Sequence, residues 1–161
     1  MTGGVLVACV GNSLLADDAA GYWVFRELSL SMLPKQVRLE HLELGGIALL
    51  DHLRGESSLV VVDAVQFGAE VGAIHVIEWE QLPKAPPAVS SHGIGIREAI
   101  ELGRALGQAK MPERVVLVGI EGDCFGSLGQ EPCAVVKRAI HRARDTVLGI
   151  LEQCEGKGER T

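Results

Sequence analysis

The sequence predicts an α/β protein: one three-layer α/β/α sandwich around a mainly parallel, twisted sheet of about five strands. Continuous apolar runs at residues 4–10 and 57–65 are typical of strands buried on both faces of a sheet. Segments with helical spacing of apolar residues separate such runs. A length of 161 residues, 47% of them hydrophobic, fits a single compact core. We therefore expect one domain over residues 1–153 and a flexible tail over 154–161.

The first part of the chain predicts a strand, a helix and a second strand. Residues 4–10 (GVLVACV) form the first strand. Apolar residues then recur at helical intervals over 19–33, and Pro34 stops that helix. Residues 36–44 alternate between apolar and polar, as a strand does. This order is a βαβ unit, which implies parallel strands.

The next segments predict a short helix, a buried strand and an edge strand. Residues 45–55 read as a helix closed by Gly55, and they lead directly into a buried strand that ends at Asp63. Residues 73–79 (AIHVIEW) alternate. Because only QFGAEVG connects them to the preceding strand, we expect an antiparallel edge strand. Residues 80–91 are a Pro-rich loop.

The last third of the chain predicts helix, strand, loop and helix. The helix is expected over 93–106, the buried strand over 113–120, and a Gly-rich loop over 121–130. Residues 131–153 carry one apolar stripe, typical of a helix packed against a sheet. The opposite, basic face is expected to be solvated surface, and it comprises Lys137, Arg138, Arg142 and Arg144.

Charge and composition exclude several classes of partner. The net charge of -6, with 15 lysines and arginines, gives no basic footprint for nucleic acid or for anionic lipid. No apolar run approaches the roughly 18 residues of a spanning helix, and the first residues lack a secretion signal, so we expect a cytoplasmic protein. The four cysteines contain no CxxC pair, which argues against a zinc knuckle or a disulfide framework and predicts buried or inert thiols.

Three chemistry-bearing side chains fall where a parallel sheet places its ligands, beyond the carboxyl ends of the strands. Asp18 lies in the loop after the first strand, Asp63 lies at the end of VVVD, and His92 precedes the helix expected from Gly93. Each has a plain structural explanation as a cap, turn or surface residue. A role as helix cap accounts for one of the adjacent aspartates Asp17 and Asp18, however, and accounts less well for the presence of both.

Together, these side chains favour a cation site. Two carboxylates repel phosphate, whereas two carboxylates and an imidazole suit a divalent ion such as Ni²⁺, Zn²⁺, Mn²⁺ or Fe²⁺ and leave coordination positions open. The positive potential at a helix N-terminus disfavours protonation of a nearby histidine, so His92 would be available as a neutral ligand. Asp17 then becomes a helix cap or a support for the ligands. A serine hydrolase is a weaker reading, because Gly11-Asn12-Ser13 has only half of the GxSxG motif. Cys124 or Cys133 as a nucleophile lacks an evident base.

The stretch VGNSLLADDAAG at residues 10–21 resembles the signature loop of the hydrogenase maturation proteases. These endopeptidases trim the C-terminal extension of the [NiFe] hydrogenase large-subunit precursor. The resemblance continues in order through most of the chain, with LGG at 44–46, VVVDAV at 60–65, SSHGIGI at 90–96 and VVLVGIEGDCFGSLG at 115–129.

The resemblance implies a set of roles. Asp18, Asp63 and His92 would be the catalytic and metal-binding residues. The metal would be nickel supplied by the precursor, and zinc or cadmium could occupy the site in vitro. The precursor would be the partner, and no serine or cysteine nucleophile is assigned. Supporting roles in the loops fall to Asp17, Gly11, Asn12, Gly45 and Gly46.

Two positions depart from the family pattern. Cys9 stands where many members have glycine, and Leu44 stands where some members have an aspartate, which removes one candidate carboxylate. Two other function classes stay open: a metal-dependent hydrolase of small amides or peptides, and a nickel-binding or nickel-sensing module without proteolysis. We expect the loops at 80–91 and 121–130 to flank the site and to be candidate contacts for the large subunit.

Overall fold

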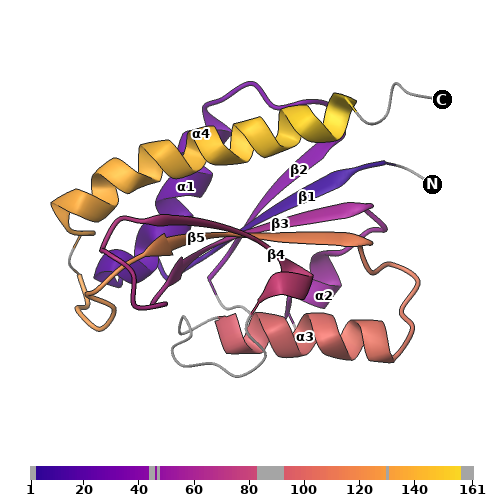
Figure 1. The fold of residues 1–161 in the computed structure, drawn as a ribbon, viewed down its shortest axis with the longest axis horizontal. Helices are drawn as coiled ribbons and strands as arrows, with labels where there is room; N and C mark the ends of the chain where they lie inside the picture. The colour runs from indigo at the N-terminus through magenta and orange to yellow at the C-terminus, as the bar shows by residue number, and fades with distance from the viewer. Residues whose placement is uncertain (1–2, 44–45, 47, 83–92, 130, 157–161) are drawn as a thin grey trace.

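The computed structural model describes residues 3–43, 46, 48–82, 93–129 and 131–156, and its centre is a five-stranded sheet (Figure 1). The strand order is β2-β1-β3-β5-β4. The strands are β1 (Val5–Val10), β2 (Val37–Leu42), β3 (Ser58–Val65), β4 (Ile74–Glu78) and β5 (Arg114–Glu121). The pairs β1–β2, β1–β3 and β3–β5 are parallel, and β4 pairs antiparallel with β5 at the edge. The predicted mainly parallel sheet and its antiparallel edge strand are confirmed.

Helices cover both faces of this sheet and complete the three predicted layers (Figure 1). The helical elements are η1 (Ala16–Ala19), α1 (Ala20–Ser29), α2 (Ala48–His52), η2 (Trp79–Gln81), α3 (Gly93–Ala105) and α4 (Ala134–Gly156). Helices α1 and α4 pack on one face, and α2 and α3 pack on the other. Within the described residues, no helix is both long enough and apolar enough to cross a membrane.

The apolar run of β1 is explained by burial on both sides. Successive side chains of a strand point to opposite faces. Val7 and Cys9 therefore belong to the core under α1 and α4, whereas Leu6 and Ala8 belong to the core over α2 and α3. Burial also raises the pKa of the Cys9 thiol well above its ordinary value. This thiol is therefore an inert part of the core, as the sequence predicts.

Some element boundaries differ from the predicted ones. Strand β3 runs on to Val65 and does not end at Asp63 as predicted. The helix expected over 19–33 ends at Ser29, and only Ala48–His52 of the segment 45–55 is helical. The last helix begins at Ala134 and runs to Gly156, so it includes the first three residues of the predicted tail. The spacing of apolar residues predicts that a helix exists better than it predicts where the helix ends, because tertiary contacts decide how far a helix extends.

The basic face of α4 is more than solvated surface. Arg142 Nη2 donates a hydrogen bond to the carbonyl oxygen of Gly72 at 2.7 Å. Arg144 Nη1 forms an ion pair with Glu27 Oε2 of α1 at 2.8 Å. Two of the four basic residues therefore bind other segments of the fold, which corrects the prediction for them.

A buried ion pair lies at the amino end of the sheet, at the start of β3. Glu56 is buried, and its carboxylate accepts hydrogen bonds from Arg38 Nε at 2.7 Å and from the backbone N–H of Arg54 at 2.8 Å. Burial pushes the pKa of Glu56 up, but these hydrogen bonds and the charge of Arg38 together hold it below its ordinary value. The ionised form of Glu56 therefore stabilises the fold at neutral pH.

Candidate active site

The loop that leaves β1 makes a close turn at Gly11. The φ angle of Gly11 is 157°, and a Cβ atom at this position would lie 2.4 Å from the backbone oxygen of Asp18. His41 Nε2 lies 2.9 Å from the carbonyl oxygen of Gly11 and fixes the turn from β2. Only a residue without a side chain lets the chain pass this close to Asp18.

The first turn of α1 brings this loop to β3. A Cβ atom on Gly21 would lie 2.0 Å from the backbone oxygen of Val10 and 3.0 Å from that of Val62, so α1 begins directly against β1 and β3. The preceding turn η1, which carries Asp18, contacts β3, which carries Asp63. Both aspartates are buried, each with 1% exposure. The structure therefore brings together the elements that hold the two predicted carboxylates.

The third predicted ligand, His92, lies outside the described residues, as do Gly45 and the 83–92 part of the Pro-rich loop. Helix α3 begins one residue later, and its first turn lies on the same side of the molecule as the carboxyl ends of the strands (Figure 1). Gly46 has a φ of 78°, and a Cβ atom on Gly95 of α3 would lie 3.2 Å from its Cα. Two glycines thus allow the loop before α2 to touch the start of α3.

The described residues alone do not complete a metal site. Within these segments, no group of three histidine, cysteine, aspartate or glutamate side chains has an arrangement that could hold a metal ion. The donor chemistry of Asp18 and Asp63 suits a divalent cation, but two carboxylates need a third ligand from another segment or from the substrate.

Asp17 has a different role from helix capping. Neither η1 nor α1 has a side-chain cap. Instead, Asp17 Oδ2 accepts the backbone N–H groups of Asp123 at 3.0 Å and Cys124 at 3.1 Å, and Asp17 Oδ1 accepts that of Cys133 at 2.9 Å. Of the two predicted roles for Asp17, helix cap or support of the loop, the cap is wrong. Its carboxylate binds backbone groups more than 100 positions later, on both sides of the Gly-rich loop, and fastens them to the loop that carries Asp18.

Further backbone contacts join these two segments. Leu15 and Leu128 form an antiparallel bridge, and the N–H of Gly129 donates to the carbonyl oxygen of Leu14 at 2.7 Å. Asn12 Oδ1 accepts the N–H of Leu14 and shapes the turn. The side chains of Leu14 and Leu128 are 59% and 74% exposed, respectively. The described part of the Gly-rich loop therefore packs against the signature loop and presents apolar groups beside it.

Glu121 is a buried acidic residue that the sequence assigned to the start of a loop. It is the last residue of β5, and its carboxylate accepts the N–H groups of Phe67 and Gly68 and lies 2.8 Å from His75 Nε2. These contacts hold the loop that follows β3, and hence the chain just after Asp63. The available signal was an acidic residue directly after an apolar strand, the same signal that pointed to Asp63.

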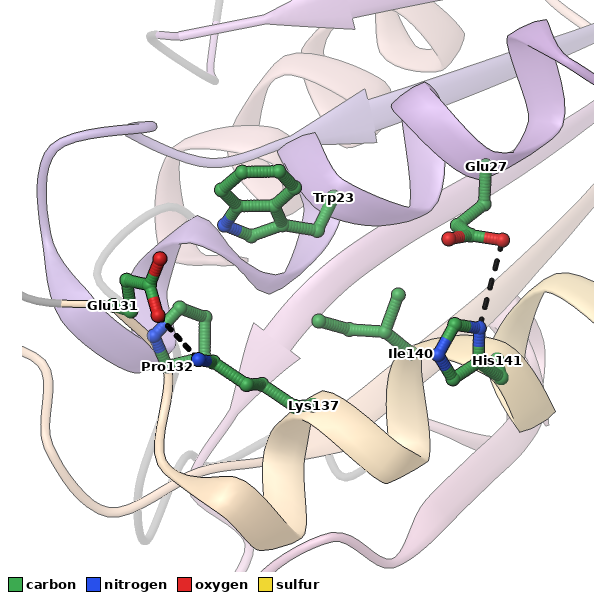
Figure 2. Close-up of a pocket in the computed structure, with 7 residues that line it drawn as sticks. All are labelled: Trp23, Glu27, Glu131, Pro132, Lys137, Ile140 and His141. Carbon is green, nitrogen blue, oxygen red and sulfur yellow. Dashed lines mark hydrogen bonds and ion pairs between the residues drawn. The ribbon is translucent and has the colours of Figure 1, made fainter.

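A pocket of about 260 Å³ lies between α1 and the first turns of α4 (Figure 2). Trp23 and Ile140 face each other across it, Glu131 pairs with Lys137 at one end, and Glu27 lies near His141 at the other. Trp23 Nε1 is buried and has no hydrogen-bond partner within the described part of the chain. The pocket contains neither predicted carboxylate, so we place the candidate chemistry at Asp18 and Asp63 instead.

Comparison with known proteins yields one consistent family. Residues 24–150 match the family described as hydrogenase maturation protease. The hydrogenase expression/formation protein HoxM of Cupriavidus necator is 31% identical over 94% of this chain and 76% of its own length. The hydrogenase 2 maturation protease of Escherichia coli is 26% identical over 92% and 91%, respectively.

Solved structures of similar fold point to the same family. The hydrogenase maturating endopeptidase HybD from E. coli superposes with a TM-score of 0.81 at 24% identity and 93% coverage of each chain, a likeness in fold. The HybD [NiFe] hydrogenase maturation protease from Thermococcus kodakarensis gives 0.73 at 25% identity, covering 92% of this chain and 99% of its own. The match over residues 24–150, the relative at 31% identity and the shared five-stranded fold lead to one conclusion: this chain belongs to the hydrogenase maturation protease family.

Proposed function

We propose that this chain is an endopeptidase that removes the C-terminal extension of a nickel-loaded [NiFe] hydrogenase large-subunit precursor. In this proposal, Asp18, Asp63 and His92 recognise the nickel ion that the precursor carries. The ion belongs to the substrate, and the protease supplies ligands that complete its coordination.

The observation that carries the proposal is the placement of two buried carboxylates in a member of this family. Asp63 lies on β3, and Asp18 lies in the turn after the neighbouring parallel strand β1, in an element that contacts β3. Carboxylate oxygens are ligands that divalent cations accept, and two of them on elements in contact can contribute to one site together with a third ligand. A divalent ion is therefore the ligand that this arrangement favours.

Recognition and cutting are linked through position. A nickel ion held both by the precursor and by Asp18, Asp63 and His92 fixes the polypeptide next to it on the enzyme. The scissile bond then remains near the site instead of diffusing freely, which is a contribution from proximity and orientation. The turn at Gly11 and the bonds of Asp17 keep Asp18 in place while the precursor binds.

The test is mass spectrometry of a hydrogenase large-subunit precursor incubated with the full-length chain. The precursor is prepared with and without nickel. We expect the wild type to release a C-terminal peptide from the nickel-loaded form only. Asp18→Asn, Asp63→Asn and His92→Ala should each lower the rate at least about 100-fold, because each removes a proposed ligand; the two asparagine variants do so with little change in volume.

A matched control is Glu56→Gln, which changes another buried carboxylate at the amino end of the sheet, away from the site. It should lower stability and leave processing of the precursor intact at a temperature where the protein is folded. Equal cleavage of nickel-loaded and nickel-free precursor would refute nickel recognition. Nickel binding without any cleavage of a genuine client would instead favour the non-proteolytic nickel-binding module.

A further inference from the structure

The pocket between α1 and the first turns of α4 is bordered by a buried hydrogen-bond donor (Figure 2). Trp23 Nε1 has no acceptor among the residues that the structure describes. Figure 2 shows this nitrogen turned toward the end of the pocket where Glu131 and Pro132 lie. A buried N–H group without a partner is unfavourable, because it has given up its bonds to water and gained none. An occupant that offers an acceptor to this nitrogen is therefore favoured.

The walls of the pocket suit an apolar group of limited size. Trp23 and Ile140 face each other across it, and Pro132, which is buried, lies at one end. The volume of about 260 Å³ is smaller than the roughly 300–1,000 Å³ of pockets that hold drug-sized ligands. One apolar side chain with its neighbouring peptide group therefore matches the pocket better than a large cofactor does.

The charged side chains at the two ends of the pocket are matched in pairs. Glu131 pairs with Lys137 at one end. At the other end, Glu27 Oε2 lies 2.8 Å from Arg144 Nη1 and 3.5 Å from His141 Nδ1. Since each carboxylate already has a basic neighbour, a free anion or a free cation gains little here. A neutral acceptor suits the indole N–H better, and the backbone carbonyl oxygen of a polypeptide is such an acceptor.

The pocket begins close to the candidate active site. Pro132 directly precedes Cys133, whose backbone N–H donates to Asp17 Oδ1 at 2.9 Å. Trp23 follows Asp18 by five residues along η1 and α1, which corresponds to about 8–10 Å of helix axis. An extended chain covers that distance with about three residues. A polypeptide held at Asp18 therefore reaches the pocket with a residue close in sequence to the group that is held.

We propose that this pocket is a docking site for the hydrogenase large-subunit precursor, an inference that rests on the proposed function. One apolar side chain of the segment next to the nickel ligands enters between Trp23 and Ile140, and a backbone carbonyl oxygen of that segment accepts the Trp23 Nε1 hydrogen. Glu131 and Lys137, whose side chains are 72% and 49% exposed, move aside at small cost, because an exposed ion pair contributes little. These contacts strengthen binding of the precursor and do not accelerate the chemical step.

The first experiment follows the indole N–H signals of the two tryptophans by NMR, using the full-length chain labelled with ¹⁵N-tryptophan and unlabelled, nickel-free precursor. The Trp23 signal is identified by its loss in Trp23→Phe. We expect this signal to shift downfield as the N–H gains an acceptor. The signal of Trp79, which belongs to the core on the other face of the sheet, should stay in place. Precursor binding, measured by calorimetry, that leaves the Trp23 signal unmoved would overturn the docking site.

The second experiment measures processing of nickel-loaded precursor. Trp23→Phe keeps an aromatic ring and removes the N–H, so KM should rise about fivefold, the effect of one hydrogen bond, at nearly unchanged kcat. Trp79→Phe, the matched control, should leave both constants within about twofold, and urea unfolding checks that both variants are folded. An unchanged KM in Trp23→Phe, or a lower kcat alone, contradicts the docking site and leaves the protease activity intact. A shifted Trp23 signal without cleavage of a genuine client supports the docking site and contradicts the protease activity.

Discussion

Removing the carboxylate of Asp17 should detach the segment 122–133 without unfolding the sheet. In Asp17→Ala, three backbone N–H groups lose their acceptor, those of Asp123, Cys124 and Cys133. Hydrogen bonds to a charged group contribute about 1.5–3 kcal/mol each, but water reaches this exposed segment and replaces part of that energy. We therefore expect a loss of about 3–4 kcal/mol. This is less than the total stability of a typical domain, about 5–15 kcal/mol.

Asp17→Asn should have a smaller effect. An amide oxygen placed like Oδ2 keeps the two donors Asp123 and Cys124, and the amide nitrogen then faces the N–H of Cys133. We expect a loss of about 1–2 kcal/mol. Urea unfolding gives these values, and hydrogen exchange should show lost protection at the N–H groups that lose their acceptor. Asp123→Asn, an exposed control, should change stability by less than about 0.5 kcal/mol. Equal effects of the asparagine and alanine variants, or protection lost across the whole sheet, would refute this reasoning.

Other changes test the remaining contacts. Gly11→Ala should abolish precursor processing and cost at least about 2 kcal/mol in urea unfolding, because the new Cβ meets the Asp18 backbone oxygen. Glu56→Gln should cost about 2 kcal/mol at neutral pH. The pKa of Glu56 in the folded protein is held below its ordinary 4.5, so the ionised side chain stabilises the fold above that value and stops doing so as the pH falls through the lower, folded pKa. The difference in free energy of unfolding between the wild type and Glu56→Gln should therefore become smaller from pH 7 to pH 3. Glu121→Gln should raise hydrogen exchange at Phe67 and Gly68, with a smaller change in α4, because its carboxylate accepts those two N–H groups.

Much of the fold could be predicted because its signals are local. The apolar runs of β1 and β3 mark strands buried on both faces, and the short connection before β4 requires an antiparallel edge. The rule that ligands gather beyond the carboxyl ends of parallel strands drew attention to Asp18 and Asp63, although β3 continues past Asp63 to Val65. The expected strand order alone was enough to place these two residues in neighbouring elements.

The partners of Asp17 could not be predicted in the same way. An aspartate before a helix has a favourable local use as a cap, so sequence reasoning offers that role for Asp17 beside a general one in supporting the loop, and it cannot name the groups that Asp17 binds. Its actual partners, Asp123, Cys124 and Cys133, are distant in the chain, and they use backbone N–H groups that every residue except proline possesses. A contact of this kind has no residue-type signature.

The buried acidic residues near the carboxyl ends of the strands divide into two groups. Asp17 and Glu121 receive two or three backbone N–H groups each, and Glu121 also lies beside His75. Their charges are used to fasten the loops that follow β5 and β3. Asp18 and Asp63 lie on the elements that those loops adjoin. All four side chains are buried at one end of the sheet, and carboxyl groups gathered in this way suit a cation better than a phosphate. The arrangement therefore fits the cation recognition proposed above better than recognition of an anionic group.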